Sequence, residues 1–184
     1  MPTLSFGKGA HLGECGFRRR KIEARFISPK YGTLTMVIRE LTQQAGLDLL
    51  TRVRLGRLAC SRANQPYIFP IFFAYHENSL YCASTIGQKI EWMRENPLVA
   101  VEVDEIVSAQ RWKSVIVSGR YEELADAPET KDMRQLAWSL LQKHELWWEP
   151  GYVETILDGA ERPMEPVYFR ICIGRITGHH ATNE

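Results

Sequence analysis

Short segments in which apolar and polar residues alternate follow one another closely in this chain, and this spacing limits the folds open to it. The segments expected to form strands cover residues 57–62, 67–75, 80–85, 98–104, 111–124 and 167–177. Most connections between them are turns or a short helix, whereas repeated parallel crossovers need a dozen or more residues each. The pattern therefore predicts an α+β chain, mainly β, in which six short strands form a small antiparallel barrel.

Three helices are expected beside these strands. They cover residues 42–54, 88–95 and 126–146. Thr42 is predicted to cap the first helix, with Gly56 just past its end, and Asp126 is predicted to cap the third. Pro70 interrupts the second strand. Because proline has no N–H to donate, that strand is expected to lie at an edge or to be bulged there.

The composition favours a single globular domain and excludes several kinds of partner. The chain has 184 residues, of which 45% are hydrophobic, and a formal net charge of +1, which gives no electrostatic argument for a nucleic-acid partner. No run of about 18 apolar residues is present, so no membrane-spanning helix is expected. The four cysteines, Cys15, Cys60, Cys82 and Cys172, are scattered. Such spacing favours free thiols in a cytoplasmic protein over a zinc site or a disulfide framework.

The chain is expected to divide into an arm, one domain and a tail. Residues 1–36 have no clear period and are predicted to be a flexible N-terminal arm. Met36 is a candidate start of translation, because the recognisable pattern begins just after it. Residues 37–178 are expected to form the single domain, and residues 179–184 the tail.

The most informative segment is the end of the third expected strand, which runs into the second expected helix. Ser84 and Thr85 end the strand, Gly87 follows, and Lys89 lies in the first helical turn. Helix N-termini present free N–H groups and the positive end of the helix dipole. With the added hydroxyl and ammonium donors, this segment could hold a phosphate. A capped helix with an exposed lysine is the other interpretation, and the spacing alone favours it.

A series of short motifs carries a resemblance to a known family. The motifs lie at residues 56–59, 66–71, 80–81, 84–85, 87–89, 96–97, 103–104 and 112–119. In this order and spacing, the chain from about residue 38 to 124 resembles the pyridoxamine 5'-phosphate oxidase-like proteins that bind flavin mononucleotide (FMN). It looks closest to the branch that includes the nitroimidazole-resistance proteins. No single motif is specific, but the series over about half the chain is.

The resemblance implies a six-stranded split β-barrel with flanking helices, which forms a homodimer with two FMN sites shared between its subunits. The residues that it places at the phosphate are Ser84, Thr85, Gln88 and Lys89. Those that it places along the isoalloxazine ring are Phe69, Pro70 and Ile71, with Cys82 and Ala83 beside the flavin. Those that approach from the next strand, in the same or the partner subunit, are Trp112, Lys113 and Ser114.

The activity that the resemblance implies is that of an FMN-dependent oxidoreductase, in which the flavin carries the chemistry and the protein positions it. NAD(P)H is a candidate electron donor, the substrate is unknown, and no catalytic side chain is identified. Two departures from the motifs of the family argue against two specific activities of its members. Gln88-Lys89 stands where the vitamin-forming oxidases carry paired basic residues, and Ala83 where many nitroimidazole-resistance members carry histidine. The alternatives are a non-enzymatic flavin store, sensor or carrier, a barrel that binds F420 or haem, and a dimer without ligand.

The histidines and the late tryptophans have ordinary interpretations. The five histidines form no HxH or HxxxH pair, so no metal site is expected. Trp138, Trp147 and Trp148 fall in or just after the third expected helix. Packing is the favoured interpretation for these rings, and the lining of a pocket is the alternative.

Overall fold

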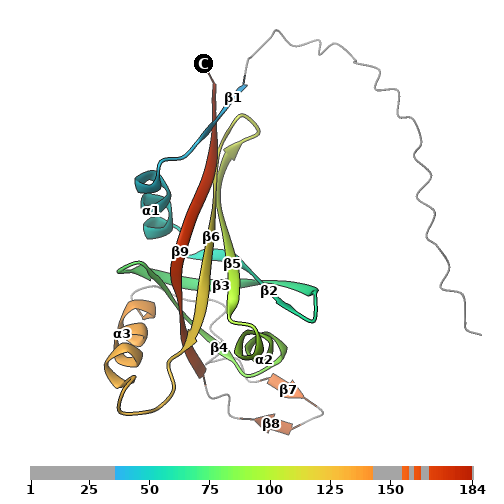
Figure 1. Ribbon diagram of the computed structural model, residues 1–184, viewed down its shortest axis with the longest axis vertical. Helices are drawn as coiled ribbons and strands as arrows, with labels where there is room; N and C mark the ends of the chain where they lie inside the picture. Colours follow the sequence, from blue (N-terminus) through green and yellow to red (C-terminus); the bar gives the residue numbers. More distant parts are fainter. Residues whose placement is uncertain (1–35, 143–154, 158–159, 163–165, 184) are drawn as a thin grey trace, which may run out of the picture. The chain divides into compact units, whose positions relative to one another are not determined.

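The computed structural model describes residues 36–142, 155–157, 160–162 and 166–183 (Figure 1). Its strands are β1 (Met36–Glu40), β2 (Leu55–Arg62), β3 (Gln65–His76), β4 (Ser79–Thr85), β5 (Leu98–Ser108), β6 (Arg111–Glu123), β7 (Thr155–Leu157), β8 (Ala160–Arg162) and β9 (Pro166–Asn183). Its helices are α1 (Gln43–Arg52), α2 (Gln88–Glu95) and α3 (Lys131–Leu141). Apart from Met36, the predicted N-terminal arm lies outside the described residues, as do Trp147 and Trp148.

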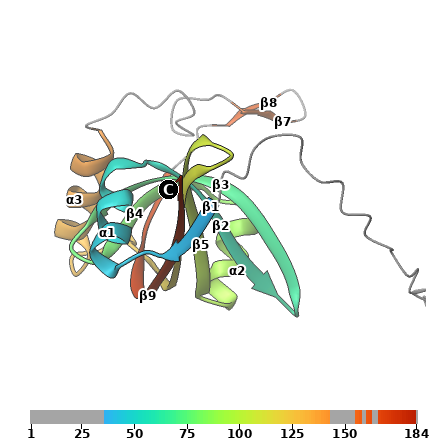
Figure 2. The ribbon, with the colours of Figure 1, turned by 90° about the horizontal axis from the view of Figure 1, so that it is seen from above.

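Six of the strands close into a ring. The antiparallel sheet runs in the order β1-β9-β4-β3-β2-β5-β6, and β6 also pairs with β9. β1 is added outside this ring, on residues 179–183 of β9. Seen from above, α1 and α3 lie on one side of the strands and α2 on the other (Figure 2). The α+β fold predicted from the sequence, a six-stranded antiparallel split β-barrel with flanking helices, is therefore confirmed.

The long strand β9 extends past the closed ring. It has 18 residues, which span about 60 Å at roughly 3.3 Å per residue. One edge pairs with β6 from Phe169 to Ala181, while the other edge pairs with β4 near the start and with β1 near the end. Residues 179–183 are thus strand where the sequence predicted a tail. Their partners, β1 and the start of β6, are far away along the chain, so the local pattern did not reveal them.

A bulge lets β6 follow β9 closely. The register between the two strands shifts between Ser118 and Gly119. A Cβ atom on Gly119 would lie 2.6 Å from the carbonyl oxygen of Cys172 and 2.7 Å from the Cγ2 atom of Ile171. Only glycine permits this approach of two backbones.

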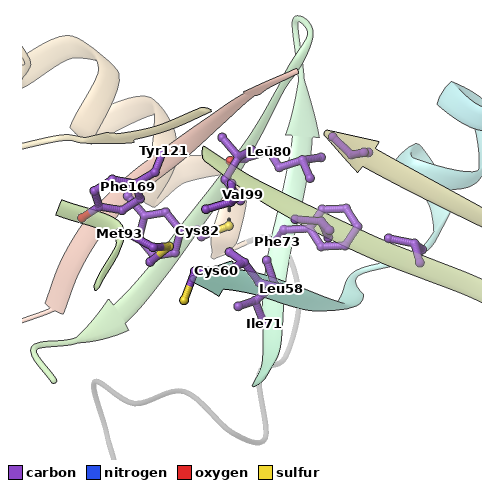
Figure 3. Close-up of a cluster of buried hydrophobic side chains, with 14 of the residues drawn as sticks. Leu58, Cys60, Ile71, Phe73, Leu80, Cys82, Met93, Val99, Tyr121 and Phe169 are labelled. Carbon is purple, nitrogen blue, oxygen red and sulfur yellow. Dashed lines mark hydrogen bonds between the residues drawn. The ribbon is translucent and has the colours of Figure 1, made fainter. Parts of the chain in front are cut away.

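Alternate residues of the ring strands build one apolar core (Figure 3). Leu58 of β2, Phe73 of β3 and Phe169 of β9 are fully buried in it. Ile90 and Met93 of α2 are also fully buried in this core. At about 1.5–3 kcal/mol for each large apolar side chain, this burial fixes α2 to the barrel and so fixes the position of its N-terminus.

A second, smaller cluster holds α3. Ala137 and Leu141 of α3 pack with Ala74, Tyr81 and Tyr168, which lie on the outer side of β3, β4 and β9. The start of α3 differs from the prediction, because Thr130, and not Asp126, is the N-cap. The Thr130 hydroxyl donates hydrogen bonds to the carbonyl oxygens of Ala125 and Ala127. These bonds close a turn over the residues that were expected to form the first helical turn.

The first helix begins as predicted but ends differently. Thr42 caps α1, and its side chain accepts a hydrogen bond from the N–H of Ala45 at 3.2 Å. The prediction for Gly56 is wrong, because this residue lies inside β2, where a Cβ would come within 2.9 Å of Val101 Cγ1. Pro70 lies on β3 beyond the part that pairs with β4, with its β2 register intact, so the expectation of an edge position is correct. None of the helices in the described ranges has the length and apolar composition needed to cross a bilayer.

Candidate functional site

The junction between β4 and α2 brings together the residues predicted to meet a phosphate. Ser84 is 5% exposed and Thr85 half-buried at the end of β4, and α2 begins at Gln88. The first amides that bond within the helix are those of Ile90 and Glu91, which both donate to the carbonyl of Gly87. The backbone N–H groups of Gln88 and Lys89 come before them and belong to the free donors of a helix start. We call residues 84–89 the phosphate cradle.

The backbone of the cradle is uncrowded at Gly87. Gly87 is the N-cap of α2, has an extended backbone and provides no side-chain cap. A Cβ atom built on Gly87 would meet no atom within 4 Å. Neither strain nor crowding therefore requires glycine here, and the backbone at the helix N-terminus is uncrowded at Gly87. Because such an end attracts anions, the residues present fit a phosphate.

Lys89 links the cradle to β3. Its Nζ atom lies 5.5 Å from the centre of the Phe69 ring, within the range of a cation–π contact. The side chain is half-buried, and burial lowers the pKa of its ammonium group. An anion bound beside it would restore the favourable surroundings that burial removed. The structure thus brings Phe69, predicted to line the ring of a flavin, together with Lys89, predicted to bind its phosphate.

The other end of α2 is tied to β6 by a polar network that the sequence did not reveal. Arg94 donates two hydrogen bonds of 2.7 Å, through Nε and Nη2, to the carboxylate of Glu123. The hydroxyl of Tyr121 donates to the same carboxylate at 2.8 Å. The bond from Arg94 lowers the pKa of Glu123, and burial raises the pKa of Tyr121. Arg94 and Glu123 are 29 residues apart in the chain, so local charge patterning gave no signal for this pair.

The remaining predicted residues on β3 and β4 face in two directions. Ile71 is 7% exposed and Cys82 fully buried, and both side chains belong to the barrel core. Burial strongly raises the pKa of the Cys82 thiol, which keeps it protonated and unreactive. Pro70 is exposed on the outer side, and Ala83 is half-buried against the cluster beneath α3. Only backbone atoms of Ile71 and Cys82 can meet a ligand outside the barrel.

Trp112, Lys113 and Ser114 lie far from the cradle within one chain. Trp112 pairs with Ala181 of β9, whereas Ser84 pairs with Val167. Val167 and Ala181 are fourteen residues apart, which corresponds to about 46 Å along a strand. Trp112 and Lys113 line a hollow of about 220 Å³ at the tip of the β5–β6 hairpin, and we call this region the hairpin half-site. The predicted site residues therefore form two groups at opposite ends of β9.

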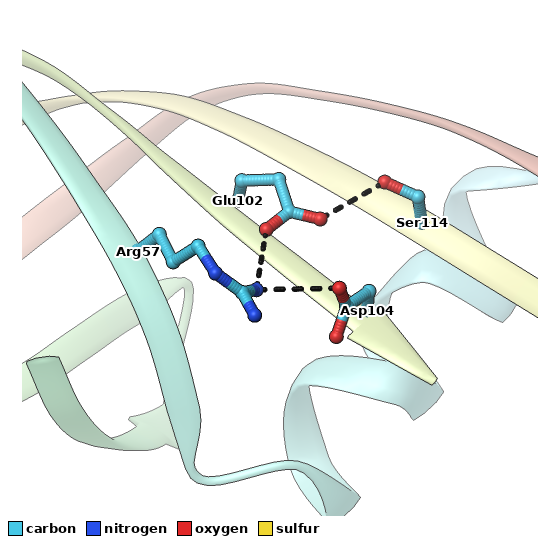
Figure 4. Close-up of polar contacts among 4 residues, drawn as sticks. All are labelled: Arg57, Glu102, Asp104 and Ser114. Carbon is cyan, nitrogen blue, oxygen red and sulfur yellow. Dashed lines mark hydrogen bonds and ion pairs between the residues drawn. The ribbon is translucent and has the colours of Figure 1, made fainter. Parts of the chain in front are cut away.

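The outer side of β3, β2, β5 and β6 carries exposed apolar side chains around a polar cluster, and we call it the outer face. Its exposed apolar side chains are Leu55, Ile68, Leu98 and Ile116. At its centre, Arg57 donates to Glu102 at 3.0 Å and to Asp104 at 3.2 Å, and Ser114 donates to Glu102 at 3.2 Å (Figure 4). The bonds to Glu102 and Asp104 raise the pKa of Arg57. Within the described ranges, no three His, Cys, Asp or Glu side chains gather as metal ligands.

Comparison with known proteins supports the same assignment of the fold. The chain matches the pyridoxamine 5'-phosphate oxidase family over residues 42–180. It is 40% identical over 146 residues to an uncharacterized protein of Rhizobium meliloti (strain 1021), covering 79% of this chain and 97% of that protein. The crystal structure of a FAD-binding protein from Mesorhizobium loti is 43% identical, with a TM-score of 0.67, over 81% of this chain and 100% of that one.

A more distant structure shares the fold. That of a proposed 5-nitroimidazole antibiotic resistance protein from Bacteroides thetaiotaomicron has a TM-score of 0.59 at 18% identity, over 80% of this chain and 89% of that one. The resemblance stated from the motifs alone is confirmed by the match to the family over most of the chain. The protein described here belongs to the pyridoxamine 5'-phosphate oxidase family.

Proposed function

We propose that this chain binds a flavin, with the phosphate of its FMN moiety in the cradle between β4 and α2. The observation that carries the proposal is the uncrowded helix N-terminus at Gly87, with the half-buried Lys89 in the first turn of the same helix. The FAD-binding protein of Mesorhizobium loti, 43% identical, supports a flavin as the ligand. The FMN moiety is common to FMN and FAD, so the same cradle serves either.

The charges of the cradle fit this ligand. A phosphate monoester carries between one and two negative charges at neutral pH. The helix N-terminus offers the equivalent of about half a positive charge, and Lys89 a full one. Charge-assisted hydrogen bonds of this kind are about twice as strong as neutral ones. Because burial already disfavours the free ammonium of Lys89, a phosphate gains more here than beside a fully hydrated lysine.

We also propose that the flavin site is completed by a second copy of the chain. The cradle and the hairpin half-site lie about 46 Å apart along β9 and cannot meet one molecule of FMN within one chain. A two-fold dimer that buries the outer face uses the same surface on both copies. In this arrangement the hairpin half-site of one copy, with Trp112 and Lys113, would face the cradle of the other. The exposed Ile68 and Ile116 support burial of this face.

For activity, we propose an oxidoreductase with NAD(P)H as electron donor. A bound flavin would supply hydride and electron transfer, while the chain positions it and excludes water. Non-enzymatic storage, sensing or transport of flavin is the second candidate. This second candidate is favoured by the chemistry of the cradle, because its described side chains are suited to binding and positioning a flavin. The nearby thiol of Cys82 is buried and held protonated.

A cytoplasmic setting is part of the proposal. Cys60, Cys82 and Cys172 are free thiols, as expected where glutathione and thioredoxin keep cysteines reduced. Mass spectrometry of the native protein after alkylation without reductant tests this. Full labelling on denaturation is expected, and a disulfide would contradict it.

The first experiment is the visible absorption spectrum of the purified protein, followed by titration of the ligand-free form with FMN and with FAD. Flavin bands, or binding of about one flavin per chain, are expected. Turnover of NAD(P)H by the flavin-loaded protein would favour the oxidoreductase, and binding without turnover the carrier. The absence of flavin bands and of binding would refute the proposed function, and the spectrum would then show whether F420 or haem is bound.

The shared site has its own test. A Lys89→Met chain and a Trp112→Ala chain each form dimers with two impaired sites. A mixed dimer, isolated through two different affinity tags, combines one intact site with one doubly impaired site. We expect the mixed dimer to bind about one flavin per two chains with wild-type affinity. If the mixed dimer binds flavin no better than the two parent dimers do, the cradle and the hairpin half-site do not contribute to the same flavin site.

A further inference from the structure

A groove lies between α3 and the start of β9, next to the cradle and outside the residues assigned so far. Its volume is about 480 Å³, and its lining residues are Lys131, Arg134, Gln135, Trp138, Pro166 and Tyr168. Specific small-molecule sites occupy about 300–1,000 Å³, so the groove has the size for a ligand or for part of one. Trp138, one of the lining residues of the groove, is 40% exposed. The position of Trp138 therefore agrees with the alternative interpretation from the sequence, in which this ring lines a pocket.

The groove adjoins the cradle at Thr85, whose side chain lies on the face of the sheet that α3 covers, whereas Ser84 faces the barrel core. Pro166 pairs directly with Thr85, and Tyr168 pairs with Ala83. Residues directly opposite on antiparallel strands point to the same face, with Cβ atoms about 4.5–5.5 Å apart. Ala83 and Tyr168 both pack into the cluster beneath α3, which shows that this is the face that α3 covers. A ligand that extends from the cradle around the end of β4, past Thr85, would therefore reach the groove at Pro166.

The side chains of the groove combine positive charge with aromatic rings. The Arg134 guanidinium lies 5.1 Å from the centre of the Tyr168 ring and donates a hydrogen bond to the carbonyl of Leu124 at 3.3 Å. A guanidinium has five N–H donors, so this anchored group can also meet an anion. Lys131, in the first turn of α3, is exposed and adds a second charge. Trp138 stands edge-on to Tyr168, with ring centres 6.4 Å apart, and its exposed surface can stack on a planar ring.

We propose that this groove holds the adenosine monophosphate half of FAD, so that FAD is the preferred flavin of this chain. Arg134 and Lys131 would bind the second phosphate of the pyrophosphate, and Trp138 would stack on the adenine, as aromatic side chains do on bases. The inference rests on the proposed flavin site, because the FMN half must first occupy the cradle. The groove adds a selectivity for FAD over FMN that the cradle alone cannot provide, because FMN ends at the phosphate that the cradle binds.

The test compares the dissociation constants of FMN and FAD, measured by isothermal titration calorimetry on the flavin-free full-length protein. Wild type is expected to bind FAD about tenfold or more tightly than FMN, since a charge-assisted hydrogen bond is worth about that factor. Lys131→Ala, and Arg134→Met, which keeps an apolar stem against Tyr168, should each reduce the preference for FAD. Both variants should leave the constant for FMN within about twofold. Arg175→Ala, at an exposed position on β9 outside the groove, is the control and should change neither.

The outcomes separate this inference from the function on which it rests. Binding of FMN and FAD with equal constants, or a preference for FAD that survives both substitutions, would overturn the groove assignment and leave the cradle intact. Failure to bind either flavin would overturn both. Circular dichroism of each variant shows whether α3 is intact. If Arg134→Met unfolds it, the exposed Lys131→Ala variant still decides the question.

Discussion

Substitution of Lys89 by methionine separates the two roles of this side chain. Methionine keeps an unbranched chain of similar length against the Phe69 ring, but removes the charge whose Nζ atom lies 5.5 Å from the ring centre. A hydrogen bond to a charged group is worth about 1.5–3 kcal/mol, so the dissociation constant for FMN should rise about 10- to 150-fold. The free energy of unfolding should change by less than about 1 kcal/mol, because the lost cation–π contact is offset by the removal of a partly desolvated charge.

The assay is titration of the flavin-free protein with FMN, followed by fluorescence, with urea unfolding of the same samples. The matched control is Lys131→Met, the same substitution in the first turn of another helix, which should leave FMN affinity unchanged. Binding should also respond to pH. Burial lowers the pKa of Lys89 in the free protein, and a bound phosphate raises it again, so wild-type affinity falls as the pH rises through the lowered pKa. Unchanged affinity in Lys89→Met, or the same alkaline loss in that variant, would refute the assignment.

Three further predictions concern the frame around the site. Gly119→Ala should lower the free energy of unfolding by about 1–3 kcal/mol in urea titrations, because its Cβ would lie 2.6 Å from a backbone oxygen of β9. Glu123→Gln should cost about 1 kcal/mol at pH 7. Arg94 holds the pKa of Glu123 below its ordinary value of 4.5, so this contribution is present above pH 4.5, and melting curves should show the difference shrinking as the pH falls below it. Ile68→Arg on the outer face should give monomers by light scattering and abolish flavin binding, whereas a wild-type mass would contradict burial of that face.

The local elements were largely predictable from the sequence, because they depend on residues close together in the chain. The bounds of α2, residues 88–95, follow from Gly87 before it and Asn96-Pro97 after it, and the structure has the same bounds. The strand predicted from alternation over residues 98–104 lies within β5, and its alternate residues Val99, Val101 and Val103 are buried. In both cases the signal and its physical cause lie within one short window.

The errors share one cause, which is that the deciding partner is distant in sequence. Gly56 stands where a helix-ending glycine belongs, but the contact with Val101 on β5 shows that it serves close packing inside β2. Residues 179–183 carry histidines and small residues without a clear alternation, yet they are strand because β1 and β6 pair with them. No local pattern reports such pairings.

Because the predicted site residues form two separate groups, flavin binding should depend on the assembly of two chains. If the cradle and the hairpin half-site complete each other only across two copies, flavin binds the dimer and stabilises it by mass action. The apparent affinity for flavin should then fall when the protein is diluted below the dissociation constant of the dimer, and excess flavin should restore the dimer mass. Trp112→Ala should weaken this coupling, because it impairs the half-site on β6, which is separated from the cradle of its own chain by about 46 Å along β9. Flavin affinity that stays constant across the monomer–dimer transition would mean that each chain holds its ligand alone, and that Trp112 and Lys113 serve another purpose.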